Sequence, residues 1–69
     1  MKMQNTMPTE GQFVAVWEYN KEVWSSTYKW YGDHLMAFDD KSDDFNSPYE
    51  SGSPSLNELK AFKATYLVR

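Results

Sequence analysis

The chain has 69 residues, a formal net charge of −3, no cysteine and 17% aromatic residues. A chain of this length forms one domain, and folding buries only about 60% of the surface that the unfolded chain exposes. The lack of cysteine excludes disulfides, thiolate catalysis and cysteine-ligated zinc. No window approaches the roughly 18 apolar residues of a membrane span, and the N-terminus does not resemble a signal peptide. We therefore expect a cytoplasmic protein that does not contact a membrane.

The charge is unevenly placed along the chain. Residues 1–38 carry a net charge of −1, residues 39–54 carry −4 and residues 55–69 carry +2. One segment therefore holds most of the negative charge. Proteins that bind a phosphate backbone cluster Lys and Arg instead, so this distribution disfavours broad binding to nucleic acid.

The N-terminal segment differs in character from the rest of the chain. Residues 1–11 are polar, lack periodicity and contain Pro8 and Gly11, which predicts a flexible arm. Residues 12–69 are expected to form a single domain.

Three strand-like segments follow the arm, at residues 12–19, 22–31 and 34–39, and they are rich in alternating, β-branched and aromatic residues. Asn20-Lys21 and Gly32-Asp33 separate them. These pairs predict two tight turns, because Asn and Gly tolerate the positive φ of hairpin turns. The segments therefore predict a three-stranded antiparallel meander.

Two-residue turns fix which residues lie opposite one another, and opposed residues share a face of the sheet. One predicted face is aromatic, and its pairs are Trp17 with Trp24, Phe13 with Tyr28, Ala15 with Ser26, Trp30 with Leu35, and Tyr28 with Ala37. The second face is mixed, and its pairs are Val16 with Ser25, Val14 with Thr27, Glu18 with Val23, Lys29 with Met36, and Thr27 with Phe38.

The C-terminal third predicts a loop and then a helix. Residues 39–54 combine acids, Ser, Gly and two prolines without periodicity, which predicts a long acidic loop. Ser55 and Glu58 fit a capping box. Apolar residues then recur at helical spacing, at Leu56, Leu59, Phe62 and Tyr66. The predicted fold class is therefore α+β: a three-stranded antiparallel β-meander with one C-terminal amphipathic helix packed on a sheet face (βββα), for which the aromatic face offers the most apolar area.

No metal or cofactor is expected. The first four oxygen ligands of a calcium-binding loop have counterparts in Asp40, Ser42, Asp44 and Asn46. The match fails at both diagnostic positions, because Phe45 stands where such loops require Gly and Ser51 stands where they require a bidentate Glu.

The single histidine, His34, lies beside Asp33, with Ser25 and Ser26 on the neighbouring strand. A nucleophile, a base and an orienting acid are thus all nearby in sequence. Adjacent strand residues point to opposite faces, however, so Asp33 and His34 cannot converge on one serine. We predict an exposed histidine and a protein that is not an enzyme.

The second sheet face requires cover, because one helix cannot lie over both sides of the sheet. Either the arm or the acidic loop folds over it, or a second chain does, since monomers seldom expose apolar patches beyond a few hundred Å². A homodimer through this face or through an edge strand therefore stands as an open alternative.

For function, we expect a small non-enzymatic protein-binding module that modulates or inhibits a larger macromolecule, for example as a phage-type inhibitor of a host or defence enzyme, the last step being analogy. The partner is expected to be a protein with a basic surface. The candidate partner-binding residues are Asp39, Asp40, Asp43, Asp44, Phe45, Tyr49 and Glu50 in the loop, and Val14, Val16, Met36 and Phe38 on the second face.

The alternative function is binding of single-stranded nucleic acid or RNA through exposed aromatics with Lys29, Lys60 and Lys63, because aromatic side chains on a sheet can stack bases. Trp17 and Trp24 are similar to the paired tryptophans of the WW module, but their spacing, the proline partner and the C-terminal segment do not fit that family. The resemblance implies no function.

Overall fold

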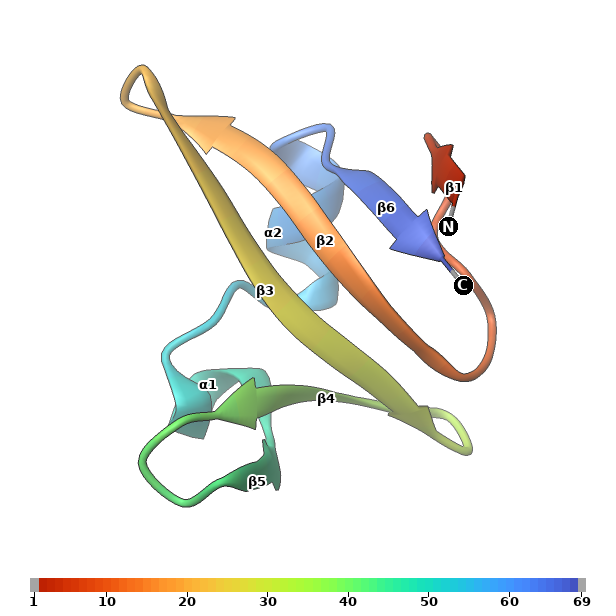
Figure 1. Ribbon diagram of the computed structural model, residues 1–69, viewed down its shortest axis with the longest axis vertical. Helices are drawn as coiled ribbons and strands as arrows, with labels where there is room; N and C mark the ends of the chain where they lie inside the picture. The colour runs from red at the N-terminus through yellow and green to blue at the C-terminus, as the bar shows by residue number, and fades with distance from the viewer. Residues whose placement is uncertain (1, 69) are drawn as a thin grey trace.

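All six strands belong to one antiparallel sheet, in the spatial order β1-β6-β2-β3-β4-β5 (Figure 1). The computed structural model describes residues 2–68. Along these residues the elements are β1 (Lys2–Gln4), β2 (Gln12–Tyr19), β3 (Glu22–Tyr31), β4 (His34–Asp39), β5 (Asp44–Asn46), α1 (Pro48–Ser51), α2 (Leu56–Ala61) and β6 (Thr65–Val68).

The two central hairpins and their registers are confirmed. Every predicted pair of the first hairpin occurs, including Trp17 opposite Trp24, and Trp30 lies opposite Leu35 in the second. At residues 20–21 the φ angles are 55° and 62°, as a type I′ turn requires at both central positions. The turn chemistry therefore sets the register of the longest strands.

The predicted βββα class is wrong, because the sheet has six strands and the C-terminal helix is short. α2 contains six residues, and Thr65–Val68 forms β6, which pairs with β2 and with β1. Phe62 and Tyr66 are four residues apart, which fits one helix face. The run from residue 65 to 68 is also β-branched and aromatic, and β2 offers it an unpaired edge, so strand pairing prevails over helical spacing.

The predicted arm and acidic loop carry short elements of their own. β1 pairs with β6, and the arm is held again where Trp30 Nε1 donates to the carbonyl of Pro8 at 2.7 Å. Within the loop, β5 pairs with β4, and α1 begins at the N-cap Ser47 and ends at Gly52, whose φ is 72°. Elements of three or four residues are too short to show periodicity.

The hydrophobic core lies on the aromatic face, beneath α2. Its buried members are Phe13, Ala15, Tyr28, Ala37, Leu59, Ala64 and Tyr66. The Phe13 ring stacks on Tyr28 with centroids 5.7 Å apart and meets Tyr66 edge-on at 5.8 Å. Leu59 is fully buried, and burial of one such side chain contributes about 1.5–3 kcal/mol.

Helix α2 is fixed at both of its ends. The predicted capping box is present, because Glu58 N donates to Ser55 Oγ at 3.3 Å and Ser55 N donates to Glu58 Oε1 at 3.1 Å. At the other end, Phe62 stacks on Trp17 at 6.4 Å and contacts Tyr19 at 5.6 Å. These contacts hold a helix that is too short to be stable alone.

The connection into α2 is tied to the sheet by Tyr28. Its hydroxyl donates to the carbonyl of Pro54 at 2.8 Å. We expect Tyr28→Phe to lower the free energy of unfolding by about 1–2 kcal/mol, because it leaves this acceptor unpaired. Urea denaturation followed by tryptophan fluorescence measures the change, and Tyr49→Phe, at a side chain that is 94% exposed, is the control with little effect.

Burial also predicts alkaline unfolding. It raises the pKa of Tyr28 above its ordinary value of 10.0 and raises the pKa of Tyr66 in the same direction. The folded state therefore keeps both phenols protonated at a pH where the unfolded chain releases them. Their contribution is complete below pH 10, and above it the free energy of unfolding should fall by about 1.4 kcal/mol per pH unit for Tyr28, with Tyr66 acting in the same direction.

Denaturant titrations from pH 8 to pH 11 check this expectation. Tyr28→Phe should remove most of the slope above pH 10, because Tyr28 is the phenol whose pKa burial raises strongly. A free energy of unfolding that stays constant through pH 11 would contradict the assignment.

Candidate protein-interaction surfaces

The sheet has one face that neither helix covers. Both helices lie behind the sheet in the view of Figure 1, on the aromatic side, where Pro54 meets Tyr28. The register places Val14 opposite Leu67 on the other side. We call that side the open face and define it by its apolar residues Met3, Val14, Val16, Val23, Met36, Phe38, Phe45 and Leu67.

Exposure along the open face agrees with this arrangement. Val23 is 73% exposed and Met3 is 49% exposed, and the other members are partly buried. Both helices of the described residues 2–68 lie on the other side of the sheet. The four second-face residues of the sequence prediction, Val14, Val16, Met36 and Phe38, thus lie on one continuous surface that extends across strands β2 and β4 and onto their neighbours.

An aromatic cluster lies at the β5 end of the open face. The rings of Phe38 and Phe45 are 5.5 Å apart, and that of Tyr31 is 6.2 Å from Phe45. Lys29 Nζ lies 5.2 Å from the Tyr31 centroid and 5.9 Å from that of Phe45. Sequence reasoning did not select Tyr31, and it selected Lys29 only for the nucleic-acid alternative, although the hairpin register already placed Lys29 opposite Met36. Aromatic side chains of this kind often dominate protein interfaces.

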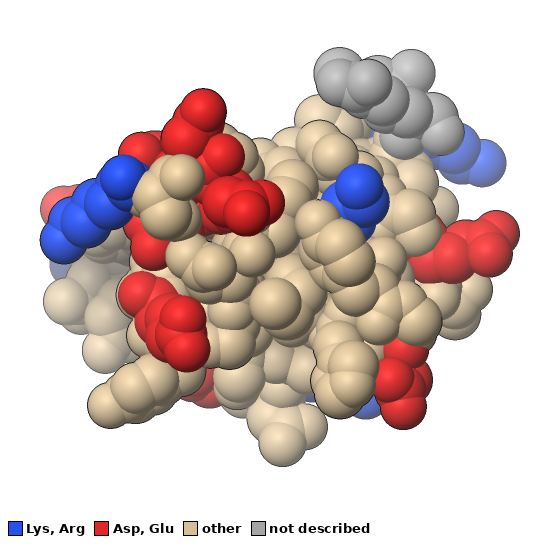
Figure 2. Space-filling model, turned by 90° about the horizontal axis from the view of Figure 1, so that it is seen from below, with Lys and Arg blue, Asp and Glu red and all other residues tan. Residues whose placement is uncertain are grey.

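The acidic turn, residues 39–44, joins β4 to β5 next to this cluster. Its carboxylates are not equivalent. Asp39 accepts from Lys41 N at 3.0 Å and from Asn46 Nδ2 at 3.2 Å, so it stabilises the turn itself. Asp40 and Asp43 are exposed. In Figure 2 a group of acidic side chains lies at the left with a basic side chain beside it, and further acidic side chains lie at the right.

The remaining loop candidates lie elsewhere. Tyr49 and Glu50 belong to α1, which contacts β4 and β5 from the side of the sheet that carries the helices. Tyr49 is 94% exposed. The structure therefore brings Phe45 together with Phe38 and leaves Tyr49 and Glu50 outside the open face.

The metal and catalytic patterns of the sequence do not converge. Across residues 2–68 no group of three or more His, Asp or Glu side chains is placed to hold an ion. His34 pairs with Asp33 at 3.4 Å at an exposed hairpin end. Ser26 faces the helices and contacts Ser53 at 3.0 Å, and Ser25 lies opposite Val16 on the other face.

The lysines of the nucleic-acid alternative are divided between the two sides of the sheet. Lys29 lies in the aromatic cluster of the open face. Lys60 and Lys63 line a cleft on the helix side. The three lysines therefore do not form one basic surface.

Comparison with protein-family models, with curated proteins and with solved structures finds no match. Neither helix in the described part of the chain is long and apolar enough to cross a membrane.

The unequal roles of the acids lead to a stability prediction. Asp39→Ala should lower the free energy of unfolding by about 1 kcal/mol, because two hydrogen bonds of the turn are lost. Asp40→Ala, at an exposed neighbour that bears the same charge, should change it by less than about 0.5 kcal/mol. Chemical denaturation compares the two variants, and equal effects would contradict the structural role of Asp39.

Proposed function

We propose that the chain is a non-enzymatic protein-binding module that docks its open face onto a larger macromolecule with a basic surface. The observation that carries this proposal is an apolar sheet face that residues 2–68 leave uncovered. Apolar surface of this extent on a small protein marks an interaction site. The lack of cysteine agrees with a cytoplasmic partner, because small secreted domains commonly depend on disulfides.

The size of the open face supports a specific interface. The sheet extends over the two longer dimensions of the molecule, 28 and 24 Å (Figure 1). A standard interface buries about 800 Å² on each partner, so the docking surface must be of similar size. The Phe38–Phe45 pair offers the aromatic anchor around which binding energy concentrates.

Charge favours a different protein over a second copy of this chain. The net charge is −3, so two copies docked face to face repel each other. Asp40 and Asp43 lie exposed next to the open face. With a basic partner, these charges speed association and help to fix how the two proteins are oriented. A rigid acidic module of this kind would inhibit an enzyme by occupying a basic surface that otherwise binds nucleic acid, which is an argument by analogy.

The proposal is tested with two variants that add the same charge on opposite sides of the sheet. Met36→Glu places the charge on the open face, and Asn57→Glu places it at an exposed position of α2. A protein captured from host lysate by the unmodified chain is purified, and its affinity for all three forms is measured by calorimetry. We expect Met36→Glu to weaken binding about thirtyfold or more, because it disrupts contacts at the centre of the interface. Asn57→Glu should leave the affinity unchanged.

Two further measurements complete the test. Asp40→Ala with Asp43→Ala should slow association and reduce its salt dependence, because steering charges act mainly on the association rate. Light scattering of the free chain should give a monomer. A stable dimer, or equal affinity for the chain and its Met36→Glu variant, would overturn the proposal.

A further inference from the structure

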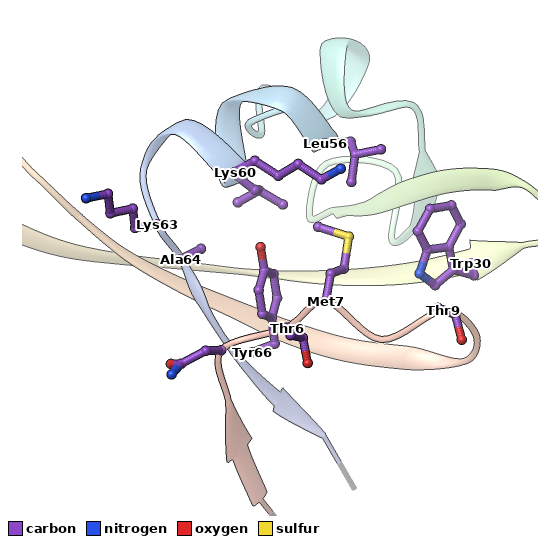
Figure 3. Close-up of a pocket in the computed structure, with 11 residues that line it drawn as sticks. Thr6, Met7, Thr9, Trp30, Leu56, Lys60, Lys63, Ala64 and Tyr66 are labelled. Atoms are coloured by element: carbon purple, nitrogen blue, oxygen red, sulfur yellow. The ribbon is translucent and has the colours of Figure 1, made fainter.

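A cleft of about 530 Å³ lies on the opposite side of the sheet from the open face, between the N-terminal arm, α2 and β6 (Figure 3). Pockets that hold small organic molecules have volumes of about 300–1,000 Å³. The apolar part of its lining comes from Met7, Trp30, Leu56, Leu59 and Ala64. Its polar part comes from Asn5, Thr6, Thr9, Lys60, Lys63 and Tyr66.

Tyr66 presents an unpaired polar group to this cleft. The residue is only 3% exposed, but within residues 2–68 its hydroxyl makes no hydrogen bond to the chain and stays accessible from the cleft. Figure 3 shows the ring rising from β6 with the hydroxyl directed toward the α2 side, where Lys60 lies. The other buried tyrosine, Tyr28, does have an acceptor, at Pro54 O. A hydroxyl that is open to the cleft is free to donate a hydrogen bond to a ligand there.

The charge of the lining has one sign. Lys60 and Lys63 both line the cleft and no acid does, although the chain as a whole is acidic. Neither lysine forms an ion pair with any residue from 2 to 68. In Figure 3 the Lys60 ammonium reaches along α2 to Leu56, and Lys63 lies at the far end with its ammonium turned outward.

Lys63 also occupies a backbone position that normally favours glycine. Its φ is +55°, and it follows the C-cap Phe62, with Lys63 N donating to Lys60 O and Ala64 N to Leu59 O, both at 3.2 Å. This is the Schellman arrangement, in which glycine is preferred at the left-handed residue. A lysine is less favourable than glycine in this conformation, and such strain concentrates at functional positions.

We propose that this cleft binds a small amphipathic anion, a linear carboxylate with an apolar chain of medium length. The chain packs against Met7, Leu56 and Trp30, and the carboxylate accepts hydrogen bonds from Tyr66 and Lys60. Charge-assisted hydrogen bonds are the strong ones, and the apolar wall rules out a purely polar anion as the preferred ligand. This site is on the other side of the sheet from the protein-binding surface and does not depend on it.

The test uses sodium octanoate and, as a matched cation of the same chain length, octyltrimethylammonium. The indole N–H resonances of the three tryptophans report the position of binding in NMR spectra. We expect octanoate to shift the Trp30 signal saturably with a dissociation constant of about 1 mM or tighter, and to leave Trp24, outside this cleft, unchanged. No shift at Trp30, an equal shift with the cation, or shifts mainly at open-face residues would overturn the proposal.

Variants separate binding from folding. Lys60→Gln should weaken octanoate binding about tenfold through loss of a charged donor, and Tyr66→Phe should weaken it about fivefold. Tyr66→Phe should leave the denaturation midpoint unchanged, because its hydroxyl has no partner in the chain. Lys41→Gln in the acidic turn removes the same charge as Lys60→Gln and should leave octanoate affinity unchanged.

Lys63→Gly should change stability and octanoate binding in opposite directions. It should raise the denaturation midpoint, because glycine suits the left-handed position, and weaken octanoate binding by less than Lys60→Gln, since its ammonium points outward. If Lys60→Gln and Tyr66→Phe bind octanoate as tightly as the unmodified chain, the cleft is not the site and the proposal fails.

Discussion

The register of the β2–β3 hairpin is the constraint on which the rest of the structure depends. The turn at residues 20–21 takes positive φ at both positions, which a type I′ turn needs. A slip of one residue would put Phe13 and Tyr28 on opposite faces of the sheet, and Leu59 would lose one of these two rings from its core. Because β6 pairs with the other edge of β2, its register is inherited from the same hairpin.

A single sheet with its helices on one side cannot bury both of its faces. The chain places Phe13, Tyr28 and its three tryptophans on the side covered by α2, and three valines with Met36 and Phe38 on the other. The core is correspondingly small, with seven buried residues among residues 2–68, and disulfides are absent from the sequence. The open face is therefore a consequence of how few elements a chain of this length can supply, and a partner that covers it would also stabilise the fold.

Sequence patterns predicted the central meander because each step was local: alternation gave the strands and turn residues gave the register. They failed at β6, since residues 62–68 satisfy a helical spacing and a strand alternation at once, and only the free edge of β2 decides between them. β1 and β5, with three residues each, carry no periodic signal. The open-face residues in β2, β3 and β4 followed from the register, whereas Met3, Phe45 and Leu67 did not, because their strands were not predicted. The cleft did not, because it forms only where the arm passes α2, a tertiary arrangement that no local pattern encodes.

The two surfaces meet in one strand. In β6, Tyr66 faces the cleft and its neighbour Leu67 faces the open side, where it lies opposite Met3 and Val14. Alternation makes this unavoidable, because successive strand residues point to opposite faces. β1 is bound to the sheet only through β6, and the arm that follows β1 forms one wall of the cleft. A ligand that bridges the arm and α2 therefore also holds β1 in place, and with it the Met3 end of the open face. By thermodynamic linkage, a partner that needs that end ordered favours the ligand by the same factor.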